Sequence, residues 1–475
     1  MKIVLVGMMG SGKSEIGKKI AGVLGLKHVD MDEEFERKNG PIYEFFKKYG
    51  EREFRKRESE LLKKISKLEN TVISTGGGVV EDAENRRVLS TMTTFYLRSS
   101  VEILWNRVKD SKRPLAKNKD YFLTLFEKRK GFYEIFKKID TDDLSEWEVT
   151  AKIVSATLKP LSSEKFDSFQ RLIIHEDFSF PPSDLTVISE NVKRIWKIDG
   201  IEVKDGEKLK KMKCVSHLWK TFLKCNLTRN SKINVVGGGT VTDTVGFASQ
   251  TFMRGMNFNL IPTTLLGMVD AAIGGKFAIN FSGVKNLVGT FGKPDVFVNP
   301  LFSISLKDET FKEGVVEALK TGAVYDKELF EHVEKNLDKI LKRDYVSLRK
   351  LITLAAKDKL EIVEKDPYDN DFRHILNFGH TIAHALESAS KNRISHGHAV
   401  AVGMKLESQK FSPSVAQRIE NVIQKLEFAD VPSSYLVHLT SWMSKDKKRA
   451  GRYIIIPVIE EIGKAHLEKI EVDML

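Results

Sequence analysis

The sequence predicts an α/β protein made of successive units. Two apolar segments, residues 3–6 and 233–236, each lead into a glycine-rich loop and then into a helical pattern, as in a parallel sheet with crossover helices. Around residues 159–170, a proline and several polar residues interrupt the pattern, which indicates a linker. At 475 residues the chain is too long for one ordinary hydrophobic core, so two or three domains are expected.

The composition is that of a soluble globular protein, with 41% hydrophobic and 30% charged residues. The longest apolar stretches are interrupted by residues such as Pro262 and Asp270 before they could span a bilayer, so no membrane segment is expected. The first strand passes directly into a glycine loop and has no cleavage site of the signal-peptide type. We therefore expect a cytoplasmic protein.

A formal charge of +12 raises the question of nucleic acid binding. The 77 basic residues are interleaved with 65 acidic ones, and no aromatic-basic motif stands out, so small anionic substrates are favoured over nucleic acid. The two cysteines, Cys214 and Cys225, exclude a disulfide framework and a cysteine-rich zinc site.

The first glycine loop, GMMGSGKS at residues 7–14, has the spacing of a phosphate-binding P-loop between a strand and a helix. Its glycines let backbone N–H groups face phosphate, the Lys13 ammonium reaches the outer phosphates, and the Ser14 hydroxyl is suited to Mg²⁺. We predict a nucleotide site with Mg²⁺, and its loop contacts are Gly10, Ser11, Gly12, Lys13 and Ser14.

The residues that follow suggest a site for the phosphate acceptor. Asp30 and Asp32 are two apart at the end of a second predicted strand, so they are expected on one side of it, where they would serve Mg²⁺ and an acceptor hydroxyl. A third strand ends in the glycines 76–78, where backbone can approach a ligand closely. Arg55 lies among so many charges that, taken alone, a solvated helix face is favoured.

Together these motifs resemble shikimate kinase over residues 1–158: the P-loop, the D-x-D pair, GEREFRKRE, GGG, RPL and an R-x-x-x-Y segment occur in order. The resemblance implies ATP and Mg²⁺, with Mg²⁺ at Ser14 and Asp30, and catalytic roles for Lys13 and Asp32. Nucleoside or gluconate kinases share the P-loop but not these arginines. Arg107 and Arg113 would contact ATP, and shikimate would be bound by Asp32, Arg55, Gly77, Gly78 and Arg129, with the arginines on its carboxylate.

The second glycine loop, GGGT followed by Asp243, is by itself only a weak dinucleotide-binding signal. Charged and hydroxyl residues then occur between apolar runs, where a ligand site and a solvated polar loop are about equally favoured. These residues are Thr263, Thr264, Asp270, Lys276, Lys285 and Asn286.

From Phe311 onward the spacing of apolar residues predicts helices. Glu317 lies one turn from Lys320, which is ordinarily a surface ion pair, but its apolar neighbours allow it to project inward. His380 and His384 share a helical face. An inward carboxylate with two histidines of the segment 373–398 would be a catalytic metal site with an open position.

The second segment resembles 3-dehydroquinate synthase over residues 185–475, through GGG with its Asp, MRG, PTTLL, VDxxxGGK, KNLVGTF, EALKTG, LNFGHTIAHALE and HG. The resemblance implies a Rossmann-like NAD-binding part at about residues 171–305 and a helical metal-binding part at about 306–475, together forming a domain at 171–475. Glu317, His380 and His396 would hold Zn²⁺ or another divalent ion such as Co²⁺. NAD⁺ would be lined by Glu207, Lys210, Gly238, Gly239, Asp243, Thr263, Thr264 and Lys285.

The same resemblance implies a substrate site and a chemistry. The substrate would be 3-deoxy-D-arabino-heptulosonate 7-phosphate, and transient oxidation by NAD⁺ would permit loss of phosphate and ring closure to 3-dehydroquinate. Lys276, Arg373 and His384 would be catalytic. Arg254 would reach into the site of a second subunit, which implies a homodimer. The substrate contacts would be Arg254, Asp270, Lys276, Asn286, Lys320, Lys359, Arg373, Asn377, His384 and Lys447, with Lys448 as the alternative to Lys447.

Two positions depart from the family pattern. Ser189 stands where an Asp is usual in an early NAD-contacting strand, and His398 stands where an acidic residue commonly follows HG. We predict a fused enzyme with both activities. The alternatives for the second half are a metal- and NAD-dependent polyol dehydrogenase and a degenerate domain used only for dimerisation.

Overall fold

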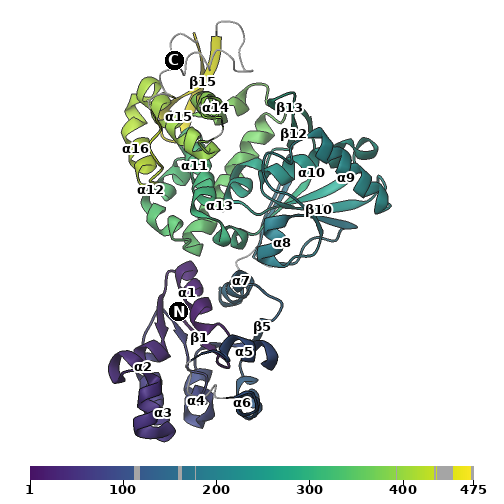
Figure 1. Ribbon diagram of the computed structural model, residues 1–475. Helices are drawn as coiled ribbons and strands as arrows, with labels where there is room; N and C mark the ends of the chain where they lie inside the picture. The colour runs from purple at the N-terminus through teal and green to yellow at the C-terminus, as the bar shows by residue number, and fades with distance from the viewer. Residues whose placement is uncertain are drawn as a thin grey trace. The chain divides into compact units, whose positions relative to one another are not determined.

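The computed structural model describes residues 1–111, 118–158, 163–176, 178–391, 393–432, 435 and 453–471. The chain divides into two compact units (Figure 1), one formed by Met1–Pro160 with Ile195–Lys197 and the other by Leu161–Arg194 with Ile198–Leu475. Two predicted contact residues, Arg113 and Lys447, lie outside the described residues.

The first unit is built on a five-stranded parallel sheet in the order β2-β3-β1-β4-β5. Its central strand, β1, is the apolar segment that begins the chain, and residues 3–6 are fully buried. Because β1 is flanked by strands on both sides, the glycine loop that follows it opens at the middle of the sheet edge. The strands are β1 (Lys2–Val6), β2 (Lys27–Asp30), β3 (Thr71–Ser74), β4 (Thr93–Arg98) and β5 (Lys137–Asp140).

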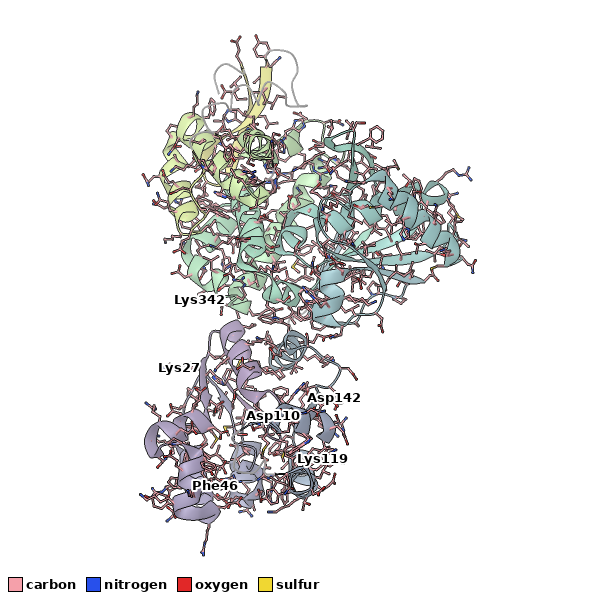
Figure 2. The ribbon with its side chains drawn as sticks, in the orientation of Figure 1. Lys27, Phe46, Asp110, Lys119, Asp142 and Lys342 are labelled. Atoms are coloured by element: carbon pink, nitrogen blue, oxygen red, sulfur yellow. The ribbon has the colours of Figure 1, made fainter. Side chains whose placement is uncertain are left out.

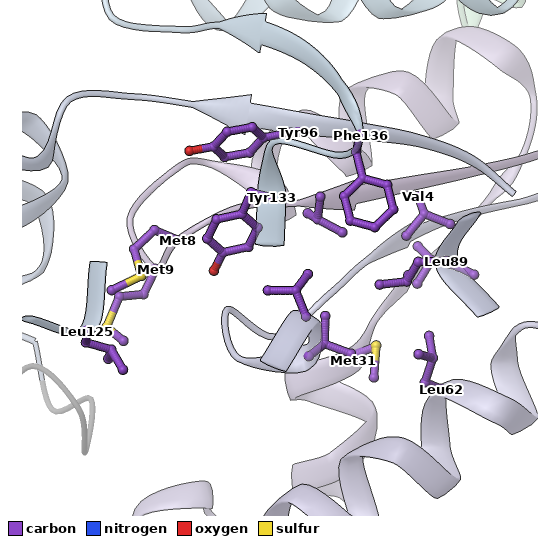
Figure 3. Close-up of a cluster of buried hydrophobic side chains, with 14 of the residues drawn as sticks. Val4, Met8, Met9, Met31, Leu62, Leu89, Tyr96, Leu125, Tyr133 and Phe136 are labelled. Carbon is purple, nitrogen blue, oxygen red and sulfur yellow. The ribbon is translucent and has the colours of Figure 1, made fainter. Parts of the chain in front are cut away.

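Helices surround this sheet and bury a core that includes Met8, Tyr96 and Tyr133 (Figure 3). The rings of Tyr96 and Tyr133 stack with centroids 5.0 Å apart. The helices are α1 (Lys13–Leu24), α2 (Met31–Asn39), α3 (Ile42–Ile65, bent at Gly50), α4 (Ala83–Ser90), α5 (Val101–Val108), α6 (Lys119–Tyr133) and α7 (Glu146–Thr157), with a short 3₁₀ turn η1 (Val79–Glu81).

The placement of Asp30 and Asp32 on one strand was wrong. Asp30 is the last residue of β2, and Asp32 lies in the first turn of α2. The Asp30 carboxylate accepts hydrogen bonds from the backbone N–H groups of Asp32 and Glu33, at 2.9 and 3.3 Å, and so caps the helix. The helix begins here because an aspartate at this position satisfies amides that would otherwise lack partners.

The second unit begins with a seven-stranded sheet in the order β6-β7-β14-β11-β10-β8-β9, parallel except for the antiparallel pair β6-β7. Strand β6 falls inside the interval predicted as a linker, so that interval is partly structured. Helix α10 packs on β10 and β11, and α9 packs on α10 (Figure 1). The elements are β6 (Glu164–Asp167), β7 (Arg171–Ile174), β8 (Leu185–Ser189), β9 (Ile201–Val203), β10 (Lys232–Gly237), β11 (Asn257–Pro262), β14 (Asp295–Val298), α8 (Glu190–Trp196), α9 (Met212–Lys224), α10 (Gly239–Thr251) and η2 (Phe252–Arg254).

The remainder of this unit is mainly helical, and an antiparallel hairpin joins it to the sheet region. The predicted helical C-terminal part is confirmed, and residues 453–471 add a second antiparallel hairpin to it. The elements are the hairpin β12 (Lys276–Phe281) and β13 (Val284–Phe291), the turns η3 (Gly267–Ala271), η4 (Pro300–Ser305) and η5 (Phe372–Asn377), α11 (Asp308–Val324), α12 (Lys327–Leu341), α13 (Tyr345–Lys365), α14 (His380–Ala389), α15 (His396–Phe411), α16 (Pro413–Gln424) and the hairpin β15 (Tyr453–Glu461) and β16 (Lys464–Glu471).

Charged side chains project from the outer faces of the ribbon, among them Lys27, Lys119 and Lys342 (Figure 2). Within the described ranges, no helix has the length and apolar character required to cross a membrane. Cys214 and Cys225 are both free thiols.

Candidate active sites

The loop after β1 has the backbone geometry of a phosphate cradle. Gly7, Gly10 and Gly12 have positive φ angles of 151°, 86° and 83°, which favour glycine. The Lys13 ammonium is buried and donates to the carbonyl oxygens of Gly7 and Met8 at 2.9 and 3.0 Å. The ammonium is therefore held over the loop, where it can reach a bound phosphate.

The predicted magnesium ligands of the loop lie together. The Ser14 hydroxyl donates to the Asp30 carboxylate across the end of β2. On the other side of the loop, the Arg107 guanidinium donates to the carbonyl oxygen of Gly10 at 3.1 Å. The structure thus brings Arg107 to the phosphate loop.

The three glycines after β3 each permit a close approach. A Cβ on Gly76 would lie 2.4 Å from a Glu58 oxygen and 3.0 Å from an Asp32 oxygen. One on Gly77 would lie 3.2 Å from the backbone nitrogen of Met9. One on Gly78 would lie 2.2 Å from the Arg55 guanidinium. The glycines therefore let the acceptor aspartate, the P-loop and an arginine converge on one turn of backbone.

Arg55 faces inward, not toward solvent as its charged surroundings alone had favoured. Its side chain is 22% exposed and pairs with the almost fully buried Glu58 at 2.7 Å. Burial acts to lower the pKa of Arg55, but Glu58 and Glu81 together hold it above its usual value. Burial raises the pKa of Glu58 despite the neighbouring guanidinium.

Arg129 is fully buried on α6, and its Nε donates to Glu81 at 2.8 Å. One turn further along, the Tyr133 hydroxyl donates to the carbonyl oxygen of Gly77, which ties α6 to the glycine turn. Sequence reasoning missed Glu81 and Glu58 as site residues. Their positions in the sequence could have indicated them. Glu58 is one helical turn from Arg55, and Glu81 ends the short turn that follows the three glycines.

In the second unit, the loops after neighbouring parallel strands meet. Gly238 precedes α10, and a Cβ on it would lie 3.0 Å from the Thr264 side chain. The backbone N–H of Thr263 donates to the carbonyl oxygen of Gly237 at 3.0 Å, and that of Gly206 donates to the Thr240 hydroxyl at 3.3 Å. The carboxyl edge of this sheet is the usual dinucleotide position in such folds.

A polar network connects this edge to the β12-β13 hairpin. The Lys210 ammonium donates to Asp243 and to the Asn286 side chain, both at 2.5 Å. The Asn280 amide donates to Glu207 at 2.7 Å and accepts from the Asn286 backbone N–H at 2.9 Å. Predicted NAD contacts and a predicted substrate contact therefore lie in one hydrogen-bonded cluster.

A second charged cluster extends from the hairpin toward the helices. Asp270 pairs with Lys359 at 2.5 Å, and the Arg373 guanidinium donates to the carbonyl oxygen of Gly274 at 3.1 Å. Gly274 has a φ of 113°, and a Cβ there would lie 2.1 Å from that guanidinium. Burial and the Arg373 charge lower the pKa of Lys276 to about 8, against the raising effect of Asp369.

A candidate metal-binding group is formed by Glu317, His380 and His396. The atoms that could bind a metal lie within 4.8 Å of one another in this part of the described structure. Glu317 is almost fully buried and pairs with Lys320, so the inward placement is the correct one of the two alternatives. The His396 Nε2 lies 3.2 Å and the His380 Nε2 3.6 Å from the same Glu317 oxygen. His384 packs beside His380, with ring centroids 5.8 Å apart.

The electrostatics of this triad suit a cation. Both Glu317 oxygens are buried; one faces the two imidazoles and the other faces the Lys320 ammonium. Burial acts to raise the pKa of Glu317, but Lys320 and the two imidazoles hold it well below its usual value. Burial and Lys320 lower the pKa of His380, whereas His396, although burial opposes it, has a pKa raised to about 10 by Glu317 and Glu387.

Three residues that sequence reasoning missed hold these ligands. Glu387, two turns after His380 on α14, lies 3.7 Å from the His396 Nδ1. The buried Glu407 accepts from the Gly379 backbone N–H at 2.7 Å, just before His380. Gly397 allows α15 to lie against α11, since a Cβ on it would be 2.5 Å from the Glu313 Cα. A signal was present for two of them, since Glu387 ends the LNFGHTIAHALE motif and Gly397 is the glycine of HG.

Other predicted residues are not brought into these clusters by the described contacts. Arg254 is exposed at the end of η2, with a φ of 69°. His398 stacks on Phe428, with ring centroids 4.8 Å apart, so it faces away from the triad. Ser189 stands where the family usually has an aspartate. Its hydroxyl donates to Asp205 at 2.7 Å, so a carboxylate still lies at the end of β8.

The fold and the two clusters define a P-loop kinase unit joined to a dinucleotide-type α/β unit with a candidate metal centre. Residues 9–158 match the shikimate kinase family, residues 200–313 the 3-dehydroquinate synthase N-terminal family, and residues 314–449 the 3-dehydroquinate synthase C-terminal family. The bifunctional shikimate kinase/3-dehydroquinate synthase of Thermotoga maritima is 39% identical over all of this chain and 99% of its own length.

Two further similarities concern the second unit. The 3-dehydroquinate synthase of Sulfolobus acidocaldarius is 38% identical over 55% of this chain and 78% of its own length. The structure of a 2-epi-5-epi-valiolone synthase from Streptomyces hygroscopicus, with NAD⁺ and Zn²⁺ bound, covers 66% of this chain and 97% of its own, with a TM-score of 0.56 and 22% identity. That structure supports the fold alone.

This chain belongs to the bifunctional shikimate kinase/3-dehydroquinate synthase family. Its activities are those of shikimate kinase and 3-dehydroquinate synthase in the shikimate pathway, as the motifs predicted.

Proposed function

We propose that the first unit phosphorylates the 3-hydroxyl of shikimate with ATP. The Gly10–Ser14 loop would bind the phosphates, Lys13 would neutralise the transferred group, and Ser14 with Asp30 would hold Mg²⁺. Asp32 would accept the hydroxyl proton, because it faces the same glycine turn as the P-loop. The observation that supports this arrangement is the convergence of loop, aspartate and arginines around Gly76, Gly77 and Gly78.

Shikimate would be oriented by its carboxylate. Arg55 of α3 lies against Gly78, Arg129 of α6 pairs with Glu81 in the turn that follows, and both guanidinium groups are largely buried. A buried guanidinium binds a carboxylate more strongly than an exposed one does, because water competes less. Arg107 would contact the nucleotide, and we keep Arg113 as a proposed contact from the motif alone.

We further propose that the second unit converts the heptulosonate 7-phosphate to 3-dehydroquinate with release of phosphate. Glu317, His380 and His396 would hold Zn²⁺ or another divalent cation, since a buried carboxylate and two imidazole nitrogens near one of its oxygens form a fitting donor set. When bound, the cation would act as a Lewis acid, and NAD⁺ would accept and return a hydride.

The protein side chains would position the substrate beside these groups. Lys276, Lys359 and Arg373 would bind its phosphate and carboxylate, and Asp270 would keep Lys359 charged. Lys276, with its pKa near neutrality, is suited to exchanging a proton, as is His384 next to the triad. The remaining proposed substrate contacts are Asn286, Lys320, Asn377 and Lys447.

The dinucleotide would lie at the carboxyl edge of the second sheet. Its proposed contacts are Glu207, Lys210, Gly238, Gly239, Asp243, Thr263, Thr264 and Lys285. Their loops already contact one another through Thr240 and the Lys210 network. We also propose a homodimer in which Arg254 completes the site of the partner subunit. Arg254 is exposed, which is compatible with this role. We place the domains at 1–158 and 171–475.

One experiment tests the synthase assignment with an internal control. We would compare 3-dehydroquinate formation by the full chain and by His380→Ala, with shikimate phosphorylation measured on the same samples. Loss of synthase activity with unchanged kinase activity is expected. Equal synthase activity in both proteins would refute the metal assignment, and accumulation of NADH would favour a dehydrogenase.

A further inference from the structure

Glu81 places a carboxylate of the protein against the arginines of the kinase site. Its Oε1 lies 2.8 Å from the Arg129 Nε, 2.6 Å from the Arg129 Nη2 and 3.9 Å from an Arg55 nitrogen. Its Oε2 lies 2.5 Å from the Lys128 ammonium. One side chain therefore meets three cations, two of which are the proposed ligands of the substrate carboxylate.

Arg129 is not well satisfied by this arrangement. It is fully buried, yet within the described structure its Nη2 has no well-aligned acceptor although Glu81 is close, and its Nη1 donates to the Met8 sulfur at 3.9 Å. A buried guanidinium needs a counter-charge and acceptors for its donors. Glu81 supplies the charge but leaves donors available, so the guanidinium remains ready for a second, better-oriented carboxylate.

The other carboxylate at this site differs in its freedom to move. Glu58 is 3% exposed and pairs with Arg55 within α3, so it is fixed by packing. Glu81 ends the short turn η1, its side chain is 19% exposed, and Lys128 beside it is 62% exposed. Glu81 can therefore leave Arg129 and keep Lys128 as its partner.

We propose that Glu81 is an internal counter-ion that occupies the Arg55 and Arg129 pair in the empty kinase site and releases Arg129 when the substrate carboxylate binds. The exchange is between two carboxylates on the same guanidinium, so no charge is left buried and unpaired at either stage. Glu81 thereby weakens substrate binding and keeps the arginines ordered without substrate. This inference rests on the proposed role of the arginines in binding the shikimate carboxylate.

The test is Glu81→Gln in the full chain. The amide has the same size and can still accept a hydrogen bond, but it has no charge to compete with the substrate. We expect the KM for shikimate to fall roughly 5- to 20-fold, as befits the loss of one competing charge-assisted interaction. The KM for ATP and the kcat should stay within about twofold, and calorimetric titration with shikimate alone should show the same gain in affinity.

Two further variants guard the interpretation. Glu84→Gln removes an exposed glutamate of α4 that pairs with the exposed Arg87, and it should change nothing. Glu81→Asp keeps the charge but withdraws it by one methylene, so it should also lower the KM for shikimate, by less. A kcat at saturation close to that of the unaltered chain verifies that each variant is folded.

An unchanged or raised KM for shikimate in Glu81→Gln would overturn the proposal, because Glu81 would then only support the arginines. Arg129→Lys separates this failure from that of the underlying assignment. If Arg129→Lys raises the KM while Glu81→Gln does not lower it, the counter-ion role alone is refuted. If Arg129→Lys leaves the KM unchanged, both the carboxylate assignment and the inference fail.

Discussion

The kinase and synthase sites arrange buried charge differently. In the first unit, the buried Arg55 and Arg129 each have a carboxylate of the chain beside them, Glu58 and Glu81. In the second unit, the buried Glu317 pairs with Lys320 through one oxygen and faces two imidazoles with the other. The comparison teaches that the first site pairs its buried guanidinium groups with carboxylates, whereas the second gathers a carboxylate and two imidazoles, donors of the kind that bind a divalent cation.

The largest effect that would sharpen this contrast is expected from Glu317→Gln. The amide keeps the shape but removes the anionic ligand, so we expect at least about a thousandfold loss of synthase activity together with loss of bound metal. Metal content by mass spectrometry and dehydroquinate formation measure this. Glu364→Gln, at an exposed position of α13, serves as the matched control, and retention of stoichiometric metal in Glu317→Gln would contradict the prediction.

The corresponding experiment in the first unit replaces the guanidinium of Arg129 by an ammonium. Arg129→Lys keeps the charge but loses the planar fork, so the KM for shikimate should rise about a hundredfold, with synthase activity unchanged. Steady-state kinetics of both reactions on one preparation give the answer. Lys130→Gln, at the exposed neighbouring position, should behave like the unaltered chain. A fall in synthase activity of similar size would instead indicate general unfolding.

A smaller effect is expected from Glu387→Gln. This residue lies beside the His396 Nδ1 and also pairs with Lys285 at 3.2 Å. It would therefore fix the orientation of the imidazole whose Nε2 faces Glu317. Loss of such a partner typically weakens metal affinity 10- to 100-fold. Competition with a coloured chelator would measure it on the metal-free chain. An affinity equal to that of the unaltered chain would show that Glu387 serves only Lys285.

The smallest effect concerns the pH dependence of metal binding at the proposed site. The pKa of His396 is raised to about 10 by Glu317 and Glu387 after burial has acted to lower it. A protonated imidazole cannot bind a metal, so binding must release this proton. Affinity for Zn²⁺ should therefore rise with pH up to about 10, by at most tenfold per pH unit for one proton. Proton release measured by calorimetry in buffers of different ionisation enthalpy checks this, and pH-independent binding would contradict it.

Local signals carried much of the fold and the family. The P-loop works because a few consecutive residues set both the backbone turn and the chemistry, and so GMMGSGKS could be interpreted without knowledge of the rest of the chain. The strand, glycine loop and helix pattern at residues 233–251 was similarly local. Asp32 was misplaced because a strand end and a helix start look alike when an aspartate caps the helix.

Other features depended on contacts that no local pattern contains. The sequence alone could not decide between a surface and a buried Glu317, because the same i, i+3 pair with Lys320 fits both; packing of α11 against α12, α13 and α15 decided it. Glu81, Glu387 and Asp205 are ordinary acidic residues until the fold places them beside Arg129, His396 and Ser189.

The sequence by itself therefore determined two enzyme units and their motifs, because these depend on residue type at short spacing, and the resemblance that the motifs carry indicated the candidate metal ligands. The tertiary structure decided which charges are buried and which carboxylate neutralises which cation. The physical reason is that the energy of a charge depends on its distance from solvent and from opposite charges, and residues far apart in the chain set both.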